Sequence, residues 1–341
     1  MIRKKDILKL TVQIRKEMGY DCENLPKIIS VNYEEESNRA YILCGDRSDK
    51  AVLMGAGGRI IVNLAKRLGL NIIIVKAYTD ILQRKERIFQ AIEAGKRILK
   101  KIKIKEITDF IEKRLLIIAK KELMNPLKIR IDKEEHIDIN VIIAYSGGVD
   151  STASLIFAKY LGANVIPITI YPGPFIIPKE TKEKIIKFTE MNKLNVKFVK
   201  PNMDFKDIVS DSMNGRYSPC KKCHSRIVQT VYEEAKREDV KIIFFGDLLP
   251  TGSHSLRIID KMLRVNFPAF LALSKNDTIV ISKLHGLKID KLRYGCPLFR
   301  VIAKRNKHIK LAAYQRILRE TRAGVLEPSQ GLKLIKSVER L

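Results

Sequence analysis

From residue 137 onward, the chain alternates between short apolar runs and longer stretches with helical spacing, and this pattern constrains its fold most. Four runs rich in Ile, Val and Phe have the length of strands, and helical patterns separate them. Such alternation is typical of an α/β fold with a doubly wound, mostly parallel sheet, in which ligands bind at the carboxyl ends of the strands. The expected strands are 140–145, 164–170, 195–201 and 240–245, and the expected helices are 151–159, 179–192 and 225–236.

The first of these strands runs directly into a glycine turn and a helix. The turn reads Ser146-Gly147-Gly148-Val149-Asp150-Ser151. Glycines allow close approach to the backbone, and the N–H groups of a helix N-terminus bind phosphate. The serine hydroxyls can donate to phosphate oxygens, while Asp150 can hold Mg²⁺ or cap the helix. The spacing fits neither a Walker A loop nor GxGxxG, and the alternative is an ordinary strand–helix turn.

This six-residue segment resembles the pyrophosphate loop of the N-type ATP pyrophosphatases. Those enzymes cleave ATP to AMP and pyrophosphate and adenylate a substrate oxygen. The resemblance implies that ATP and Mg²⁺ bind at residues 146–151. It also places adenine beside the end of the second strand, at Ile170, and the nucleotide near Gly246 and Asp247 at the end of the fourth.

Three cysteines form a second group with chemical potential. Cys220 and Cys223 form a CxxC, and Cys296 follows far downstream. Two thiolates from one helical turn can hold zinc or one corner of an iron–sulfur cluster, or form a redox disulfide. For zinc, His224 could be a fourth ligand. Cys22 and Cys44 have no partner at a ligand spacing and are expected in the core.

Together, the loop and the cysteines resemble the tRNA thiolation enzymes of the same superfamily, the 2-thiouridine, 2-thiocytidine and archaeal 4-thiouridine synthetases. The resemblance implies that Cys220, Cys223 and Cys296 hold an iron–sulfur cluster, expected to be of the 4Fe–4S type, with one iron open for sulfide. It further implies catalytic roles for Asp150 and Asp247, and for Arg226, a basic residue that would face phosphate or the target base. The expected enzyme is an ATP-dependent tRNA sulfurtransferase that replaces a pyrimidine carbonyl oxygen with sulfur.

The N-terminal 78 residues predict a separate small unit with the order α-β-β-α-α-β. A glycine loop, Gly55-Ala56-Gly57-Gly58, separates its two short central helices, and Arg59 follows it. This arrangement resembles a K-homology (KH) domain, in which a GXXG loop clamps a nucleic-acid backbone. The resemblance implies RNA contacts from Gly55, Gly58 and Arg59. The alternative is a helix–helix turn without function.

The charge distribution favours a polyanionic partner. The net charge is +27 over 341 residues. Residues 251–341 contain 19 Lys and Arg against 6 Asp and Glu, and residues 1–140 contain 30 against 20. Positive charge at both ends is typical of a protein that grips an extended nucleic acid. The expected segments are 1–78 (KH-like), 79–135 (a basic helical connector), 136–300 (the ATP pyrophosphatase domain) and 301–341 (a basic helical tail).

Other features of the sequence indicate the cellular compartment and the partners of the protein. No apolar run approaches the roughly 20 residues that span a bilayer, and the chain opens without a signal-peptide pattern, so we expect a cytoplasmic protein and no membrane partner. The expected partners are tRNA or another structured RNA and a sulfur donor, either sulfide or a carrier protein, and a homodimer is left open. Two other interpretations remain: a loop enzyme that amidates or ligates a small molecule and carries structural zinc, and a non-catalytic RNA-binding protein.

Overall fold

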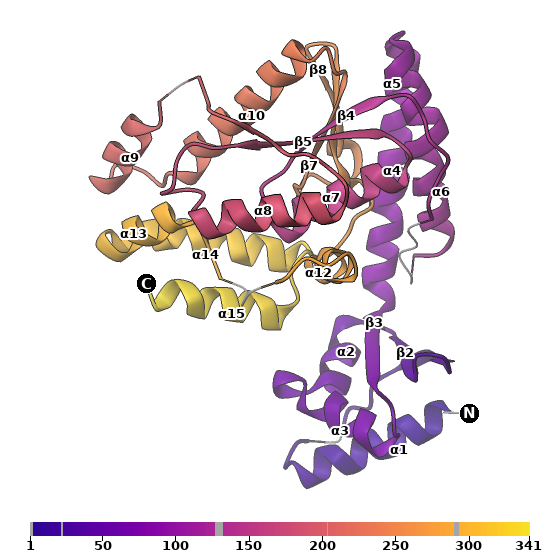
Figure 1. Cartoon of the computed structure of the whole chain (residues 1–341). Helices are drawn as coiled ribbons and strands as arrows, with labels where there is room; N and C mark the ends of the chain where they lie inside the picture. The colour runs from indigo at the N-terminus through magenta and orange to yellow at the C-terminus, as the bar shows by residue number, and fades with distance from the viewer. Residues whose placement is uncertain (1–2, 22, 127–131, 203, 290–292) are drawn as a thin grey trace. The chain divides into compact units, whose positions relative to one another are not determined.

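The computed structural model describes residues 3–21, 23–126, 132–202, 204–289 and 293–341, so Cys22 lies outside the described residues. The chain divides into two compact units, Met1–Glu86 and Arg87–Leu341. Their boundary falls within one long helix, α4 (Tyr78–Lys101) (Figure 1). The division into four segments stays a prediction.

The first unit has the order of helices and strands that the sequence predicts. Its three strands form a sheet in the order β1-β2-β3, in which β1 and β2 are antiparallel and β2 and β3 are parallel. The glycine loop lies between α2 and α3, as a short 3-10 turn. The elements are α1 (Lys4–Glu17), β1 (Ile28–Glu34), β2 (Arg39–Cys44), α2 (Arg47–Met54), η1 (Ala56–Gly58), α3 (Arg59–Arg67) and β3 (Ile72–Ala77).

Apolar side chains at helical spacing build the core of this unit. Ile60 and Leu64 of α3 lie one turn apart and are fully buried against the sheet, together with Ile7 of α1 and Ile42 of β2. Cys44 is buried in the same cluster, as predicted. The unit therefore has a hydrophobic core of its own.

The second unit contains a six-stranded sheet in the order β6-β5-β4-β7-β9-β8. All neighbouring strands are parallel except the edge strand β8, which is antiparallel to β9. The chain moves outward from β4 through β5 to β6 and then returns to β7 on the other side of β4. The topological switch point, where parallel sheets bind ligands, therefore lies between β4 and β7. The strands are β4 (Asn140–Ala144), β5 (Asn164–Ile170), β6 (Lys197–Val199), β7 (Ile242–Phe245), β8 (Leu256–Ile259) and β9 (Met262–Asn266).

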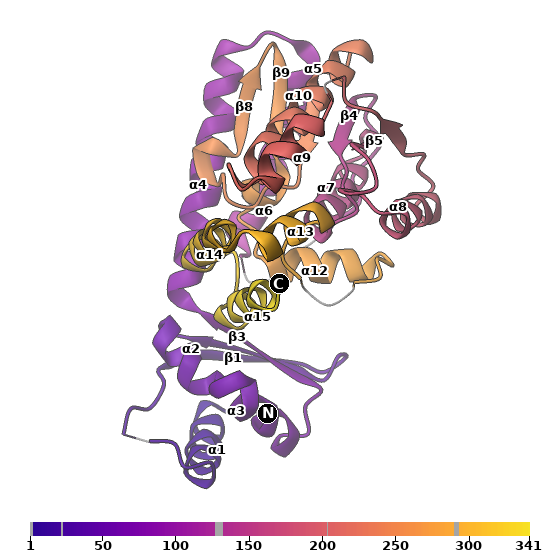
Figure 2. The ribbon, with the colours of Figure 1, turned by 90° about the vertical axis from the view of Figure 1, so that its left-hand side faces the viewer.

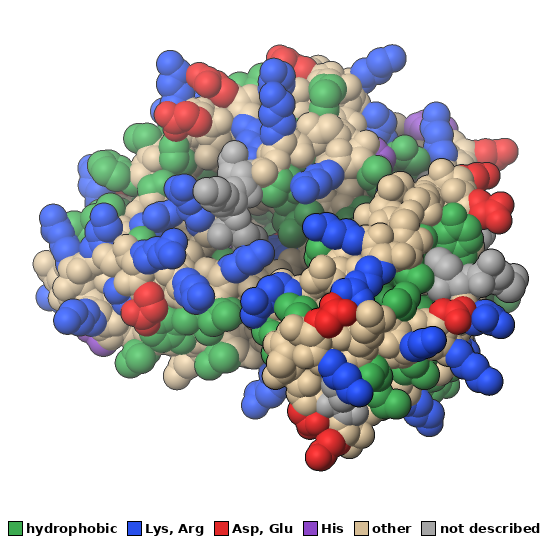
Figure 3. Space-filling view, turned by 90° about the horizontal axis from the view of Figure 1, so that it is seen from below, with side chains coloured by type: hydrophobic (Ala, Val, Ile, Leu, Met, Phe, Trp, Pro, Cys, Tyr) green, Lys and Arg blue, Asp and Glu red, His purple; other side chains and the backbone are tan. Residues whose placement is uncertain are grey.

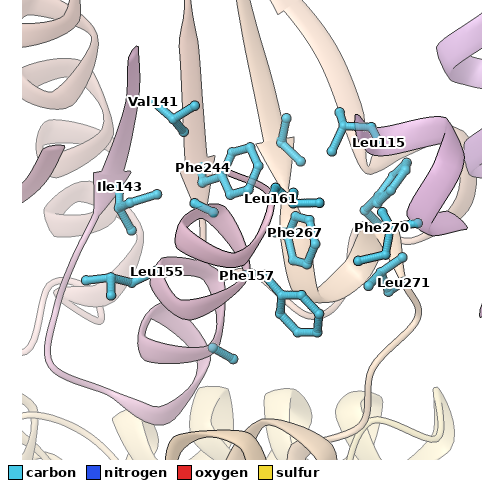
Figure 4. Packing of buried hydrophobic residues seen from close by; sticks show 14 of the residues in the cluster. Leu115, Val141, Ile143, Leu155, Phe157, Leu161, Phe244, Phe267, Phe270 and Leu271 are labelled. Carbon is cyan, nitrogen blue, oxygen red and sulfur yellow. The ribbon is translucent and has the colours of Figure 1, made fainter. Parts of the chain in front are cut away.

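Helices cover both faces of this sheet because its central strands carry apolar side chains on both sides. On one face, Phe244 of β7 stacks on Phe267, with ring centroids 5.1 Å apart (Figure 4). Phe244 also contacts Phe110 edge-on, with ring centroids 5.9 Å apart. On the other face, Val231 and Ala235 of a single helix, α10, pack on the sheet. The first face is covered by α4, α5 (Lys105–Phe110), η2 (Ile111–Leu115), α6 (Leu116–Met124), α7 (Val149–Tyr160), α8 (Lys179–Met191), α11 (Phe267–Phe270) and α12 (Lys275–Leu284), and the second by α10 (Cys220–Arg237).

The remaining helices form a separate apolar cluster. Helices α13, α14 and α15 pack together and against α9, and the cluster includes Cys220 and Cys296 at its margin. Their bounds are α9 (Lys206–Met213), α13 (Pro297–Arg305), α14 (Lys307–Arg322) and α15 (Pro328–Glu339). Among the described residues, no helix is long and apolar enough to cross a membrane.

Candidate active site

The glycine turn connects β4 to α7 and lies at the switch point of the sheet. Gly147 has φ +72°, and a Cβ there would lie 2.6 Å from Ile185 Cγ1, so this position requires glycine. The Ser151 hydroxyl donates to the Gly148 carbonyl at 3.1 Å and accepts from the Ser146 N–H at 3.2 Å. These bonds hold residues 146–151 in one turn, and the last backbone N–H groups of this turn lie at the N-terminus of α7.

Gly246 lets the end of β7 approach this turn closely. A Cβ on Gly246 would lie 2.7 Å from Ser151 N and 3.0 Å from the Asp150 carbonyl carbon. The Ser154 hydroxyl also bridges the two elements, since it lies 3.1 Å from the Asp150 carbonyl and 3.3 Å from the Phe245 carbonyl. Gly246 therefore lets the end of β7 pack directly on the first turn of α7, without a side chain between the two backbones.

Asp150 is held by two residues of α12 that the sequence did not single out. Lys275 Nζ lies 2.5 Å from Asp150 Oδ2, and the Thr278 hydroxyl donates to Oδ1 at 2.8 Å. The side chains of Asp150 and Lys275 are 24% and 16% exposed, so much of this ion pair is shielded from solvent. The pattern of Ser274 followed by Asp277 predicts the start of a helix, and it forms a capping box here. This local pattern does not predict that Lys275 pairs with Asp150, which lies 125 residues upstream.

Asp247 is also paired rather than free. Arg264 of β9 donates to its Oδ2 at 2.8 Å and lies over the Phe245 ring, 4.1 Å from its centroid. Asp247 thus stands at the carboxyl end of β7, where the sequence placed it, but its charge is balanced by an arginine. Its catalytic role stays a prediction. Ile170 ends β5 with its side chain buried on the α10 face, so only its backbone is available at the strand end.

The three cysteines come from two helix N-termini. Cys220 and Cys223 occupy the first turn of α10, and Cys296 is the N-cap of α13. Gly295, with φ +75°, precedes this cap, and the Leu298 N–H donates to the Phe175 carbonyl at 3.0 Å. That bond ties α13 to the loop that follows β5. Since α10 runs from the carboxyl end of β6 to the amino end of β7, its first turn lies on the carboxyl side of the sheet, as the glycine turn does.

The three thiols influence one another electrostatically. Burial raises the pKa of Cys223 to about 12, and the charges of Cys296 and Cys220 add to this. Burial also raises the pKa of Cys220, an effect opposed by a hydrogen bond from Ser218. The thiols of Cys220 and Cys223 therefore favour the neutral form, because burial and the nearby negative charge of another thiolate both disfavour ionisation. A bound cation would remove that penalty.

This donor set has the chemistry for a metal or a cluster, since three thiols of similar burial interact. In the part of the chain that the structure describes, however, no group of three or more His, Cys, Asp and Glu side chains is arranged closely enough to hold a metal ion. The residues fit the chemistry of an iron–sulfur cluster or zinc, but binding would require the thiols to lose their protons and move together.

Arg226 lies one turn after the CxxC and makes a double ion pair. Its Nη1 and Nη2 lie 2.6 Å from the two carboxylate oxygens of Asp207 on α9. This pairing holds the pKa of Asp207 at about 2, below its usual 3.8. In this structure Arg226 braces α10 against α9, and a role toward phosphate or a base stays a prediction.

In the first unit, three of the four residues of the glycine loop have left-handed backbone conformations. Gly55, Gly57 and Gly58 all have φ between +64° and +76°. A Cβ on Gly55 would lie 2.5 Å from Ile60, whereas the space beside Gly57 is open. Arg59 contacts the Tyr20 hydroxyl at 3.3 Å. The loop needs its glycines for its shape, and contact with RNA stays a prediction.

Comparisons with known proteins give a family but no activity. No family model matches the chain. Among solved structures, U34-tRNA thiolase NcsA from Methanococcus maripaludis with its 4Fe–4S cluster is 15% identical over 68% of this chain and 78% of that one. The TM-score is 0.36, which is too low to support an argument.

Two proteins of Methanocaldococcus jannaschii are more similar in sequence. The uncharacterized protein MJ1599 is 27% identical over 139 residues, which is 40% of this chain and 49% of that protein. The uncharacterized protein MJ1638 is 35% identical over 211 residues, which is 62% of this chain and 77% of that protein. The chain therefore belongs to the family of MJ1638.

Proposed function

We propose that this protein is an ATP-dependent RNA sulfurtransferase that acts on tRNA. One observation carries the proposal: a phosphate-type glycine turn and three interacting thiols both belong to the carboxyl side of the same sheet. The turn supplies a means of activating an oxygen, and the thiols supply a means of delivering sulfur.

The first step is activation by ATP at the turn between β4 and α7. A pyrimidine carbonyl oxygen attacks the α-phosphorus, the oxygen–phosphorus bond forms, and the bond to the β-phosphate breaks to release pyrophosphate. The N–H groups at the start of α7 and the Lys275 ammonium offset the negative charge that grows on the departing group. Asp150 would hold Mg²⁺, in which case Lys275 would leave its carboxylate and turn to phosphate.

The second step replaces the activated oxygen with sulfur. A sulfur nucleophile attacks the pyrimidine carbon that carries the adenylated oxygen. The carbon–sulfur bond forms, the carbon–oxygen bond breaks, and AMP leaves with the former carbonyl oxygen. An iron–sulfur cluster bound by Cys220, Cys223 and Cys296 would supply an open iron that binds sulfide. The partial burial of the three thiols would limit access of water, which would otherwise hydrolyse the adenylate.

RNA as the substrate is favoured by charge. Figure 3 shows Lys and Arg side chains spread over the face in view, in excess over Asp and Glu side chains. The net charge of +27 far exceeds what solubility requires. The first unit, with Gly55, Gly58 and Arg59 at its glycine loop, would bind the RNA backbone as KH domains do.

The proposal is tested with ATP labelled on its α-phosphate, incubated with anaerobically purified protein and unmodified tRNA transcripts. Formation of AMP and pyrophosphate that depends on RNA is the expected result, with Asp150→Asn as the inactive control. Formation of ADP instead would reject this chemistry. Iron and zinc analysis of the same sample separates a cluster from structural zinc, in which His224 would be the fourth ligand.

A further inference from the structure

A groove runs between α4 and the edge strand β8 of the second unit. Figure 2 shows the upper part of α4 lying beside β8. The groove has a volume of about 290 Å³, and its floor consists of apolar side chains, among them Ala94, Ile98 and Leu256. It lies outside the candidate active site, and neither of the two proposed chemical steps uses it.

The rim of this groove is positively charged. Arg97 and Lys101 line it from α4, and Arg257 lines it from β8, while no acidic side chain of the described residues contributes to its lining. All three cations are exposed. Over the described ranges, none of them forms an ion pair, and the nearby carboxylate of Glu93 is bound to Lys96 at 2.7 Å.

Arg257 occupies an electrostatically unfavourable position. It lies directly opposite Arg264 in the antiparallel pair of β8 and β9, and like charges at such positions destabilise a sheet. Arg264 is compensated by Asp247, but the only hydrogen-bond partner of the Arg257 guanidinium within the described part of the chain is a ring nitrogen of His254, at 3.2 Å. A phosphate bound to the Arg257 guanidinium at this edge of the sheet would reduce the repulsion.

A chain of hydrogen bonds connects the groove with the candidate active site. Arg264 joins Asp247 to Asn266, whose side chain lies 3.2 Å from its Nε. The Asn266 amide then donates to the carbonyl of His254 at 3.4 Å, and His254 holds Arg257. These bonds hold Arg257 in a defined position relative to Asp247 at the end of β7, so a ligand bound to Arg257 would be positioned relative to the candidate active site.

We propose that this groove binds the sugar–phosphate backbone of the RNA substrate, with Arg97, Lys101 and Arg257 on phosphates and the apolar floor against ribose. The inference rests on the proposed function for the nature of the substrate. Three separated cations along an exposed groove match the repeated charges of a strand better than a single small anion. None of the three residues belongs to the proposed catalytic machinery.

The test measures the binding of an end-labelled, unmodified tRNA transcript to the full chain over a range of salt concentrations. The groove variant carries Arg97→Gln, Lys101→Gln and Arg257→Gln. The matched control removes the same charge from three exposed lysines of α8 and the turn after it. These elements connect β5 to β6, at the edge of the sheet opposite β8. The control substitutions are Lys179→Gln, Lys187→Gln and Lys193→Gln. Thermal unfolding verifies that both variants are folded.

For the groove variant we expect binding about 10- to 100-fold weaker than that of the wild type. The slope of the logarithm of the binding constant against the logarithm of the salt concentration should also be smaller by about 2 to 3, since each phosphate contact contributes roughly one unit to it. The control should bind within about twofold of the wild type. Arg257→Lys should retain most of the affinity, because a lysine keeps the phosphate contact and loses only the bond to His254.

Equal losses in the groove variant and the control would overturn the inference, since general surface charge would then explain binding. Unchanged binding by the groove variant would also overturn it and leave the proposed function intact. If the wild type fails to bind the transcript at all, the RNA substrate of the proposed function fails, and the inference fails with it.

Discussion

A single methyl group at residue 246 tests the packing that shapes the glycine turn. In Gly246→Ala, the new Cβ would lie 2.7 Å from Ser151 N and 3.0 Å from both the Asp150 carbonyl carbon and Ser151 Cα. These are backbone atoms in the first turn of α7 and cannot rotate away. The end of β7 and the start of α7 must therefore separate by several tenths of an ångström.

The expected cost follows from that displacement. Overpacking against a fixed backbone costs about 1–3 kcal/mol. For a unit of this size, each kcal/mol lowers the melting temperature by about 2–4 °C. Gly246→Ala should thus melt roughly 2–12 °C lower than the wild type in calorimetry. It should also bind a non-hydrolysable ATP analogue at least tenfold more weakly, because the same shift disturbs the N–H groups of the turn.

Gly148→Ala is the matched control, from within the turn itself. Gly148 has φ −81°, and a Cβ there would only touch Ser146 Oγ, at 3.4 Å. Its stability should stay within about 0.5 kcal/mol of the wild type. Nucleotide binding should still weaken, since a methyl group would stand where phosphate approaches the backbone. An unchanged melting temperature in Gly246→Ala would refute the packing argument, and full ATP affinity in Gly148→Ala would refute the assignment of the turn.

Three further changes probe the surroundings of the turn and the cysteines. Lys275→Met leaves the shielded Asp150 carboxylate without its cation, so ATP binding by calorimetry should weaken about 10- to 100-fold, from the loss of one charge-assisted contact of about 1.5–3 kcal/mol; an unchanged affinity would count against a contact with phosphate. Asp207→Asn should lower the melting temperature at neutral pH, and its difference from the wild type should shrink as the pH falls from about 4 toward 2. The pKa of Asp207 is lowered by Arg226, so the stabilisation is present above the unfolded pKa near 3.8 and is lost as the carboxylate is protonated; a constant difference across this range would contradict the pairing. Cys296→Ser should lower the iron bound after anaerobic reconstitution without changing the circular dichroism spectrum, and unchanged iron would remove this residue from the set of ligands.

The central strands of the second unit could be predicted because their apolar runs are long enough to leave a pattern. Buried parallel strands are apolar on both faces, and the helices between them repeat every three to four residues. The sequence does not predict the hairpin of β8 and β9. Its strands have four and five residues, and its turn uses Asp260 and Lys261 with positive φ instead of the Asn-Gly that marks such turns.

The partners of the candidate site residues could not be predicted, since they are distant in sequence. Asp150 and Lys275 meet because α12 packs on α7, and nothing near either residue specifies that contact. The same holds for Asp247 with Arg264. The local sequence thus predicts where the glycine turn lies, whereas the charged side chains that pair with its residues are determined by tertiary packing.

Mass spectrometry of nucleosides tests the central claim most directly. Digested tRNA from a strain that lacks this gene is compared with tRNA from the same strain carrying either the intact gene or the Asp150→Asn variant. The account predicts that one thiolated pyrimidine disappears on deletion and returns only with the intact gene. An unchanged set of thionucleosides in the deletion strain would contradict sulfur transfer to tRNA.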